Sequence, residues 1–156
     1  MGHHDYRLAL RWDDRGVGTV DYRTYPRQFR VTTPGKPELV GSADPHFRGD
    51  AQLYNPEELL VIALSSCHLL SYLALAARER IEVVGYTDEA SGRMIGDGDG
   101  GRFAHVVLRP QVTIAPGADE ARALALHRDA HASCYIASSV SFPVTHEPNV
   151  VMLARP

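Results

Sequence analysis

The stretch Asn55-Pro56-Glu57-Glu58-Leu59-Leu60, which runs on into Ser65-Ser66-Cys67-His68, predicts the start of a long helix with a cysteine inside it. Asn55 suits an N-cap, Pro56 suits the first helical position, and Glu58 lies where a capping box places its carboxylate. Apolar residues then recur at helical spacing: Leu59, Ala63, Cys67, Leu70, Leu73, Ala74 and Ala77. The flanking residues are apolar too, so residues 60–77 predict a central, buried helix.

Strand patterns on both sides of this helix predict an α+β fold in one domain, residues 1–156. Alternation and turn residues predict strands near 6–12, 17–24 and 27–33, followed by a connection over 34–54 that is rich in proline, glycine and aspartate. Beyond the helix the expected elements are strands over 81–95 and 102–115, a hairpin loop over 97–101, a helix over 118–131, a short helix near Ser133 and a strand over 142–153.

Composition excludes several classes of protein. The chain has 156 residues, of which 44% are hydrophobic and 22% charged, as in an ordinary globular domain. Its net charge of -3 gives no general attraction to nucleic acid or to an anionic membrane. We find no uninterrupted apolar stretch of about 18 residues and no apolar secretory segment at the start, and His3 and His4 are given no function. We therefore expect a cytoplasmic protein that binds neither nucleic acid nor membrane.

The chain has only two cysteines, Cys67 and Cys134. Two are too few for a disulfide framework, and in a reducing compartment such a pair is more often catalytic or metal-binding than a static crosslink. We interpret them as a redox pair with Cys67 as the nucleophile. Cys67 lies about three turns into its helix, so a positive charge from elsewhere is needed to stabilise its thiolate. The alternative is a small, buried core residue.

Glu57 precedes Cys67 by roughly 15 Å of helix rise and about 80° of rotation, so it cannot touch the cysteine of its own chain. Either Glu57 only interacts with the helix dipole, or it serves the Cys67 of a neighbouring subunit across a twofold axis.

A zinc site is a second alternative. His127, His131 and Cys134 are spaced to share one helix face, and Cys67 and His68 could complete a ligand set. There is, however, no CxxC motif. We expect no metal, and interpret His68 as a histidine near the core with some chance of lining the site.

An arginine beside Cys67 would lower the pKa of its thiol and hold an oxygen-bearing substrate. Arg15 in the first turn and Arg27 at the start of the third predicted strand are the candidates, and the residues alone do not choose between them.

The motif Asn55–Leu60, Ser66-Cys67 and the segment Ala130–Cys134 resemble the OsmC/Ohr family of thiol-dependent hydroperoxide reductases. The resemblance runs over nearly the whole chain. It implies an intertwined homodimer in which antiparallel sheets wrap two long central helices, with two active sites at the subunit interface.

By the same resemblance, Cys67 matches the peroxidatic cysteine, Cys134 the resolving cysteine and Glu57 the glutamate of the motif. The family arginine maps onto Arg15, because Arg15–Val20 is similar to the family pattern, with Arg27 as the fallback.

Two positions depart from the family. Tyr135 replaces a frequent proline after the second cysteine, and His68 replaces an aromatic residue after the first. They indicate a less characterised branch.

The resemblance implies a peroxidase that reduces organic hydroperoxides to alcohols. Cys67 becomes a sulfenic acid, Cys134 condenses with it to a disulfide, and an external dithiol, in this family typically a lipoylated protein, reduces the disulfide without a bound cofactor. The alternative function is a non-catalytic protein of the same fold that binds a hydrophobic small molecule in the interface cavity.

Overall fold

The computed structural model describes residues 2–96 and 100–154. The chain forms two compact units, Met1–Leu60 and Val61–Pro156. The prediction of a single domain over residues 1–156 stays a prediction.

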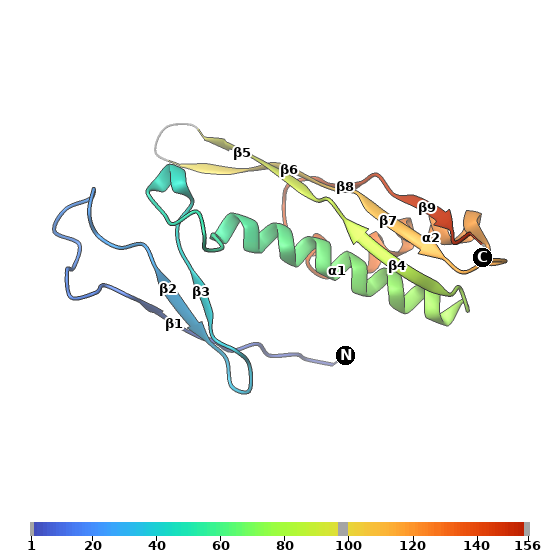
Figure 1. The fold of residues 1–156 in the computed structure, drawn as a ribbon, viewed down its shortest axis with the longest axis horizontal. Coiled ribbons are helices and arrows are strands. Elements are labelled where there is room, and N and C mark those ends of the chain that lie inside the picture. The colour runs from blue at the N-terminus through green and yellow to red at the C-terminus, as the bar shows by residue number, and fades with distance from the viewer. Residues whose placement is uncertain (1, 97–99, 155–156) are drawn as a thin grey trace. The chain divides into compact units, whose positions relative to one another are not determined.

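The first unit contains a small antiparallel sheet (Figure 1). Its strands, in spatial order, are β1 (Ala9–Trp12), β2 (Phe29–Thr32) and β3 (Leu39–Gly41). A short 3-10 helix, η1 (Pro45–Phe47), follows. The first and third predicted strands are therefore confirmed in shorter form, whereas β3 lies inside the passage that we expected to be an irregular connection.

The strand predicted over 17–24 is wrong, because turns occupy that segment. Gly16 and Gly18 adopt positive φ angles of 74° and 68°, which a strand does not allow. The side chain of Asp21 accepts a hydrogen bond from the backbone N–H of Arg23 at 2.9 Å, an Asx turn that competes with strand pairing.

The long helix α1 (Pro56–Arg78) begins as the sequence predicts. The side chain of Asn55 accepts a hydrogen bond from the N–H of Glu58 at 2.8 Å, and the Glu58 carboxylate accepts one from the N–H of Asn55 at 3.1 Å. This reciprocal pair is a capping box, and it fixes where the helix starts.

The second unit contains two three-stranded sheets and a second helix (Figure 1). One sheet has the order β4 (Val83–Asp88), β7 (Pro110–Ile114) and β9 (Asn149–Met152); the other has β5 (Ser91–Gly96), β6 (Gly101–Leu108) and β8 (Val144–His146). Helix α2 (Glu120–Ser133) and the 3-10 helix η2 (Ala137–Ser139) lie between β7 and β8 in the chain.

The three long strands predicted after α1 are each divided in two. Each half pairs in a different sheet: β4 and β5 are separate strands, as are β6 and β7, and β8 and β9. The predicted hairpin joins β5 to β6, since Gly96 pairs with Gly101, although residues 97–99 of its loop lie outside the described residues. The predicted second helix is confirmed as α2, two residues later along the chain, and η2 occupies the region of the predicted short helix.

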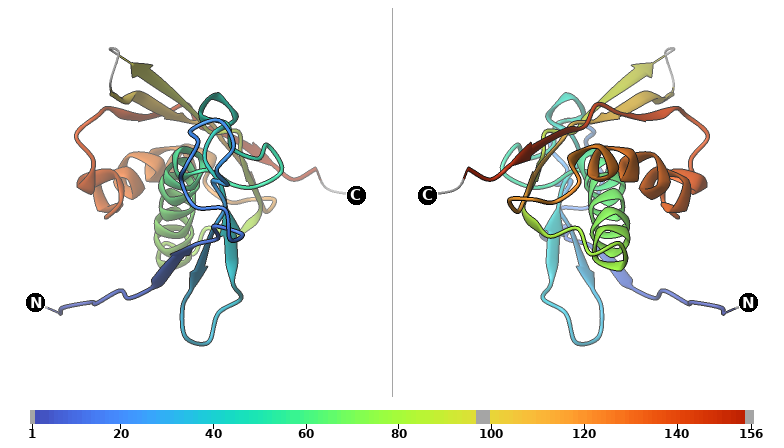
Figure 2. Two further views of the ribbon diagram at one scale, coloured as in Figure 1. Left: turned by 90° about the vertical axis from the view of Figure 1, so that its left-hand side faces the viewer. Right: turned by 90° about the vertical axis from the view of Figure 1, so that its right-hand side faces the viewer.

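The core of the second unit lies between α1, α2 and the β4–β7–β9 sheet. α2 lies beside α1 (Figure 2), and the Tyr72 hydroxyl donates to the Ala123 carbonyl at 3.2 Å. The buried hydrophobic residues that form this core are Tyr72, Ala76, Ile81, Val112, Ile114, Ala123, Leu126, Ala130 and Val150.

The expected burial of α1 on all sides is wrong for the single chain. Leu64, His68, Tyr72 and Ala76 are buried on one stripe, whereas Leu70 is 66% exposed. An apolar helix with one open face needs a further covering surface.

By length and composition alone α1 could also cross a bilayer, a test that core helices of soluble proteins pass too.

Candidate functional site

The two cysteines meet in the second unit, although 66 positions separate them in the sequence. Cys67 lies in the middle of α1 and is partly exposed, while Cys134 is the C-cap of α2 and is only 1% exposed. Cys67 lies near enough to the Cys134 thiol to raise its pKa, and no disulfide joins the two. The arrangement places a reachable thiol against a shielded one, as disulfide formation between an attacking and a resolving cysteine requires.

Burial raises the pKa of the Cys134 thiol to about 11, and the neighbouring Cys67 contributes to that shift. The backbone N–H of Ala137 donates to the Cys134 sulfur at 3.4 Å and opposes the effect of burial. Cys134 therefore keeps its proton at neutral pH.

Four histidines gather in the second unit, and we call His68, His127, His131 and His146 the histidine cluster. His68 Nε2 lies 3.0 Å from His127 Nδ1, and the two rings stack with centroids 5.3 Å apart. His146 lies 5.5 Å from His68 and also 5.5 Å from His131, measured between ring centroids. The cluster joins α1, α2 and β8.

The sequence indicated only part of this cluster. The i, i+4 spacing of His127 and His131 placed them on one helix face, but nothing in the sequence pointed to His146, which comes from a strand. His68 is a buried histidine near the core, as predicted, with 1% of its surface exposed.

Burial disfavours the charged forms of three of these histidines. It lowers the pKa of His68 to about 4 and that of His127 to about 3, and it lowers the pKa of His146 as well, with neighbouring histidines adding to each shift. The cluster does not form a metal centre: among residues 2–96 and 100–154, no three His, Cys, Asp or Glu side chains are arranged to hold a metal ion. The zinc alternative therefore has no geometric support in the described part of the chain.

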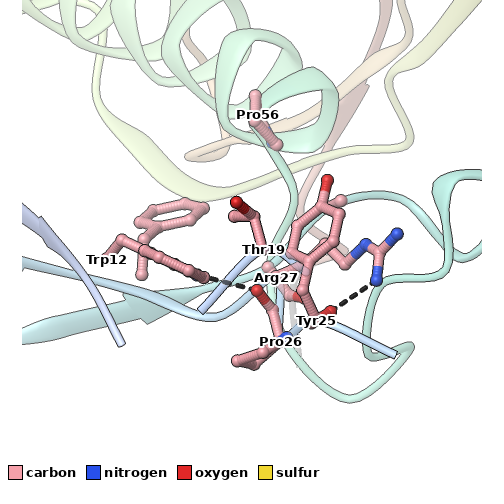
Figure 3. Close-up of a pocket in the computed structure, with 9 residues that line it drawn as sticks. Trp12, Thr19, Tyr25, Pro26, Arg27 and Pro56 are labelled. Atoms are coloured by element: carbon pink, nitrogen blue, oxygen red, sulfur yellow. Dashed lines mark hydrogen bonds between the residues drawn. The ribbon is translucent and has the colours of Figure 1, made fainter. Parts of the chain in front are cut away.

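In the first unit, Arg27 lies in an aromatic cavity of about 380 Å³ (Figure 3). Its guanidinium stacks on the Tyr25 ring at 3.6 Å and donates to the backbone carbonyls of Tyr25 and Tyr22. Trp12 and Phe29 line the same cavity, and the Trp12 indole N–H donates to the Pro26 carbonyl at 2.7 Å. The Nε of Arg27 is buried and has no hydrogen-bond partner among the described residues, so it could bind an acceptor that enters the cavity.

Arg15, the other candidate arginine, has a different environment. It lies in the exposed turn before Gly16 with a φ of 49°, and its Nη2 donates to the Gln28 side chain at 2.6 Å. Both arginines line a second cavity of about 360 Å³ in the first unit. Neither arginine appears among the ion pairs of the described residues.

Glu57 lies in the first turn of α1, where a carboxylate interacts favourably with the helix dipole. Its Oε2 is buried and unpartnered among the described residues. A buried carboxylate oxygen without a donor is costly, so a partner for Glu57 from outside these contacts would be stabilising.

Comparison with known proteins identifies the class. The family model described as OsmC-like protein matches residues 49–149, a segment that includes Glu57, both cysteines and the whole histidine cluster. An OsmC-like protein of unknown function from Vibrio cholerae is 31% identical, with a TM-score of 0.86 over 94% of this chain and 100% of that one. The chain belongs to the OsmC-like family.

Two further solved structures share the fold at lower identity. An organic hydroperoxide resistance protein from Legionella pneumophila is 17% identical, with a TM-score of 0.66 over 95% of this chain and 98% of that one. One from Elizabethkingia anophelis is 18% identical, with a TM-score of 0.65 over 94% and 99%. No functionally curated protein matches the chain. The mixed α+β fold predicted from the sequence is thus confirmed as OsmC-like, with a redox and hydroperoxide-resistance theme among its structural relatives.

Proposed function

We propose that the protein is a thiol-dependent peroxidase that reduces organic hydroperoxides to alcohols. The observation that carries this proposal is the contact between a partly exposed Cys67 and a shielded Cys134, brought together by two different helices. Family membership and the names of two structural relatives point to the same chemistry.

In the first step, the Cys67 thiolate attacks the distal oxygen of the hydroperoxide. The O–O bond breaks, an S–O bond forms, and the departing alkoxide takes a proton to become the alcohol; Cys67 is oxidised to a sulfenic acid. In the second step, the Cys134 sulfur attacks the sulfenic sulfur, an S–S bond forms, and the hydroxyl leaves as water with the thiol proton. An external dithiol, which we expect to be a lipoylated protein, then reduces the disulfide by exchange.

Glu57 and one of the two arginines are the proposed supporting residues. A guanidinium stabilises a thiolate and can bind the peroxide oxygens, and a carboxylate can orient it. Both arginines already donate hydrogen bonds, Arg27 to two backbone carbonyls and Arg15 to Gln28. We favour Arg27 because its Nε is buried and has no partner among the described residues. The apolar composition of α1, the helix that carries Cys67, supports an apolar substrate over hydrogen peroxide.

We further propose that the working form is a cytoplasmic homodimer. The open apolar face of α1, which includes Ile62 and Leu70, supports a second copy as the covering surface. In such a dimer, the unpartnered carboxylate oxygen of Glu57 could meet groups of the other subunit.

A second candidate function is the binding of a hydrophobic small molecule, with the cysteines idle. The aromatic cavity around Arg27 is the observation that favours it. The two functions differ in what happens to the thiols when a peroxide is added.

Stopped-flow oxidation of the reduced protein separates them. We expect cumene hydroperoxide to oxidise the protein much faster than hydrogen peroxide, and Cys67→Ser to abolish turnover. Oxidation at the rate of an ordinary free thiol, or full activity in Cys67→Ser, would refute the peroxidase proposal and favour the binding protein.

A further inference from the structure

Three side-chain hydrogen bonds connect α1, or the residue that follows it, to α2 in antiparallel order. At one end the Arg122 Nε donates to Glu79, the residue after α1, at 2.6 Å, and in the middle the Tyr72 hydroxyl donates to the Ala123 carbonyl. The imidazole pair formed by His68 and His127 comes next. From Glu79 back toward Cys67, each successive residue bonds a partner on α2 that lies closer to Cys134. These hydrogen bonds therefore set one register between the two helices.

Of these three hydrogen bonds, the imidazole pair is the one closest in sequence to the cysteines. His68 follows Cys67 directly, and His127 lies about two helical turns before Cys134. The Tyr72 ring stacks on His127 at 4.1 Å and holds its plane. The rotation of α1 that presents Cys67 to Cys134 is therefore the rotation that brings the His68 ring to His127.

The imidazole pair is held in a buried setting that resists change. His68 and His127 are 1% and 0% exposed, and their outer ring nitrogens have no partner among the described residues. His131 and Tyr72 from the two helices, His146 from β8, and Tyr86 and Asp88 from β4 are the titratable groups around them. None of these groups is a hydrogen-bond partner of His68 or His127, so the described residues offer the pair no competing side-chain bond.

Disulfide formation is demanding in geometry. The sulfurs must approach to about 2.05 Å, with the two Cα atoms roughly 4.4–6.8 Å apart. Sliding one helix by a single residue moves a side chain by about 1.5 Å and turns it by about 100°. An error of about 1 Å in reacting groups can cost a hundredfold in rate. The step between Cys67 and Cys134 therefore depends on the register of α1 against α2.

We infer that His68 and His127 are positioning residues for the resolving step: their hydrogen bond fixes the helix register in which Cys134 reaches the sulfenic acid of Cys67. This inference rests on the proposed peroxidase function. It concerns the second step alone, in which the S–S bond replaces the S–OH bond and water leaves. The first step, between Cys67 and the peroxide, does not use the pair.

The test compares the two steps in single turnovers with one equivalent of cumene hydroperoxide. Trapping with dimedone measures sulfenic acid, and loss of the second thiol measures the disulfide. In the double variant H68L/H127L both partners are replaced by apolar side chains, so neither is left as a buried imidazole that has lost the other, and the fold is preserved. We expect disulfide formation to slow by about tenfold or more while sulfenic acid forms at the wild-type rate.

The double variant H68Q/H127N is the matched control. The Gln amide reaches the position of Nε2 and the Asn amide that of Nδ1, so the hydrogen bond can form again without an imidazole. We expect it to restore the resolving rate to within about threefold of wild type, a rescue that loss of general packing would not produce. Unchanged disulfide formation in H68L/H127L, or no rescue in H68Q/H127N, would overturn the inference. Failure of wild-type protein to form sulfenic acid would instead refute the peroxidase proposal.

Discussion

At the scale of single residues, the two cysteines differ in environment in the way that their proposed roles require. Cys134 is buried, with a thiol pKa raised to about 11, whereas Cys67 is partly exposed. A thiol that keeps its proton does not compete for peroxide, so only Cys67 should react first.

Cys134→Ser should separate the two chemical steps. We expect the variant to form the sulfenic acid at a rate close to wild type, because Cys67 is intact, and then to stop, because no second thiol is present. Dimedone trapping and mass spectrometry would show about one modified cysteine per chain. Multiple turnovers with a dithiol at the wild-type rate would contradict the role of Cys134.

The choice between the two arginines is also a residue-scale prediction. Arg27→Met should lower kcat/KM for cumene hydroperoxide by about a hundredfold, since one charged donor to a reacting group is worth about 3 kcal/mol. Arg15→Met, the matched exposed variant, should change it by less than about threefold. The opposite ranking would assign the supporting role to Arg15.

At the scale of elements, the N-terminus of α1 is held by side chains that the sequence identifies directly. Asn55→Ala removes the acceptor for the Glu58 N–H and should lower the free energy of unfolding by about 1 kcal/mol. Asn55→Asp keeps an acceptor at the same place and should be close to neutral. Urea unfolding of both variants measures the difference; an equal loss in both would show that the cap is not the cause.

The histidine cluster predicts how stability depends on pH. An unfolded histidine titrates near pH 6.5, whereas burial lowers the pKa of His68 to about 4 and that of His127 to about 3. The unfolded state therefore binds more protons in acid. The free energy of unfolding is therefore highest above about pH 6.5 and decreases as the pH falls from there through about 4. The two histidines together account for a loss of about 3 kcal/mol or more.

Thermal unfolding between pH 7.5 and 4 checks this prediction, with the variant H68L/H127L as the control. The variant should lose less stability than wild type over the same range, because it lacks two groups that take up protons on unfolding. Parallel curves for the two proteins would assign the acid sensitivity to other residues.

The sequence predicts helices and strands well where the signal is local, and less well where the pairing of strands within a sheet determines their bounds. The capping box of Asn55 and Glu58 and the periodicity of the following residues located α1 within a residue or two. The strand predicted over 17–24 failed because Gly16, Gly18 and the Asp21 side chain form turns. Strands near 81–95, 102–115 and 142–153 read as continuous, because a change of partner sheet leaves no mark in the alternation of residues.

In the candidate site, too, the sequence predicts what is local and misses what depends on packing between distant segments. The presence of only two cysteines predicts a redox pair, and the family resemblance assigns the roles of Cys67 and Cys134. Their proximity depends on how α1 packs on α2, which no local pattern encodes. His146 joins His68 and His127 from a strand, so its part in the cluster could not be seen in helical spacing.

At the scale of the whole molecule, the open apolar face of α1 predicts a second copy. Sedimentation should give about twice the chain mass of 17.1 kDa. Leu70→Glu should weaken the dimer by at least about tenfold, because Leu70 is 66% exposed in the single chain and a charge at an apolar interface is costly. Leu124→Glu, at an exposed leucine of α2, is the control. A monomeric wild type would refute the dimer.

The measurement that tests the account most directly is peptide mapping of the reduced protein after one equivalent of cumene hydroperoxide. The account predicts one product, an intramolecular disulfide between Cys67 and Cys134, with both thiols lost together and restored by a dithiol. Two thiols that stay free, or a Cys67 that proceeds to sulfinic acid while Cys134 stays reduced, would contradict the claim that these cysteines act as a pair.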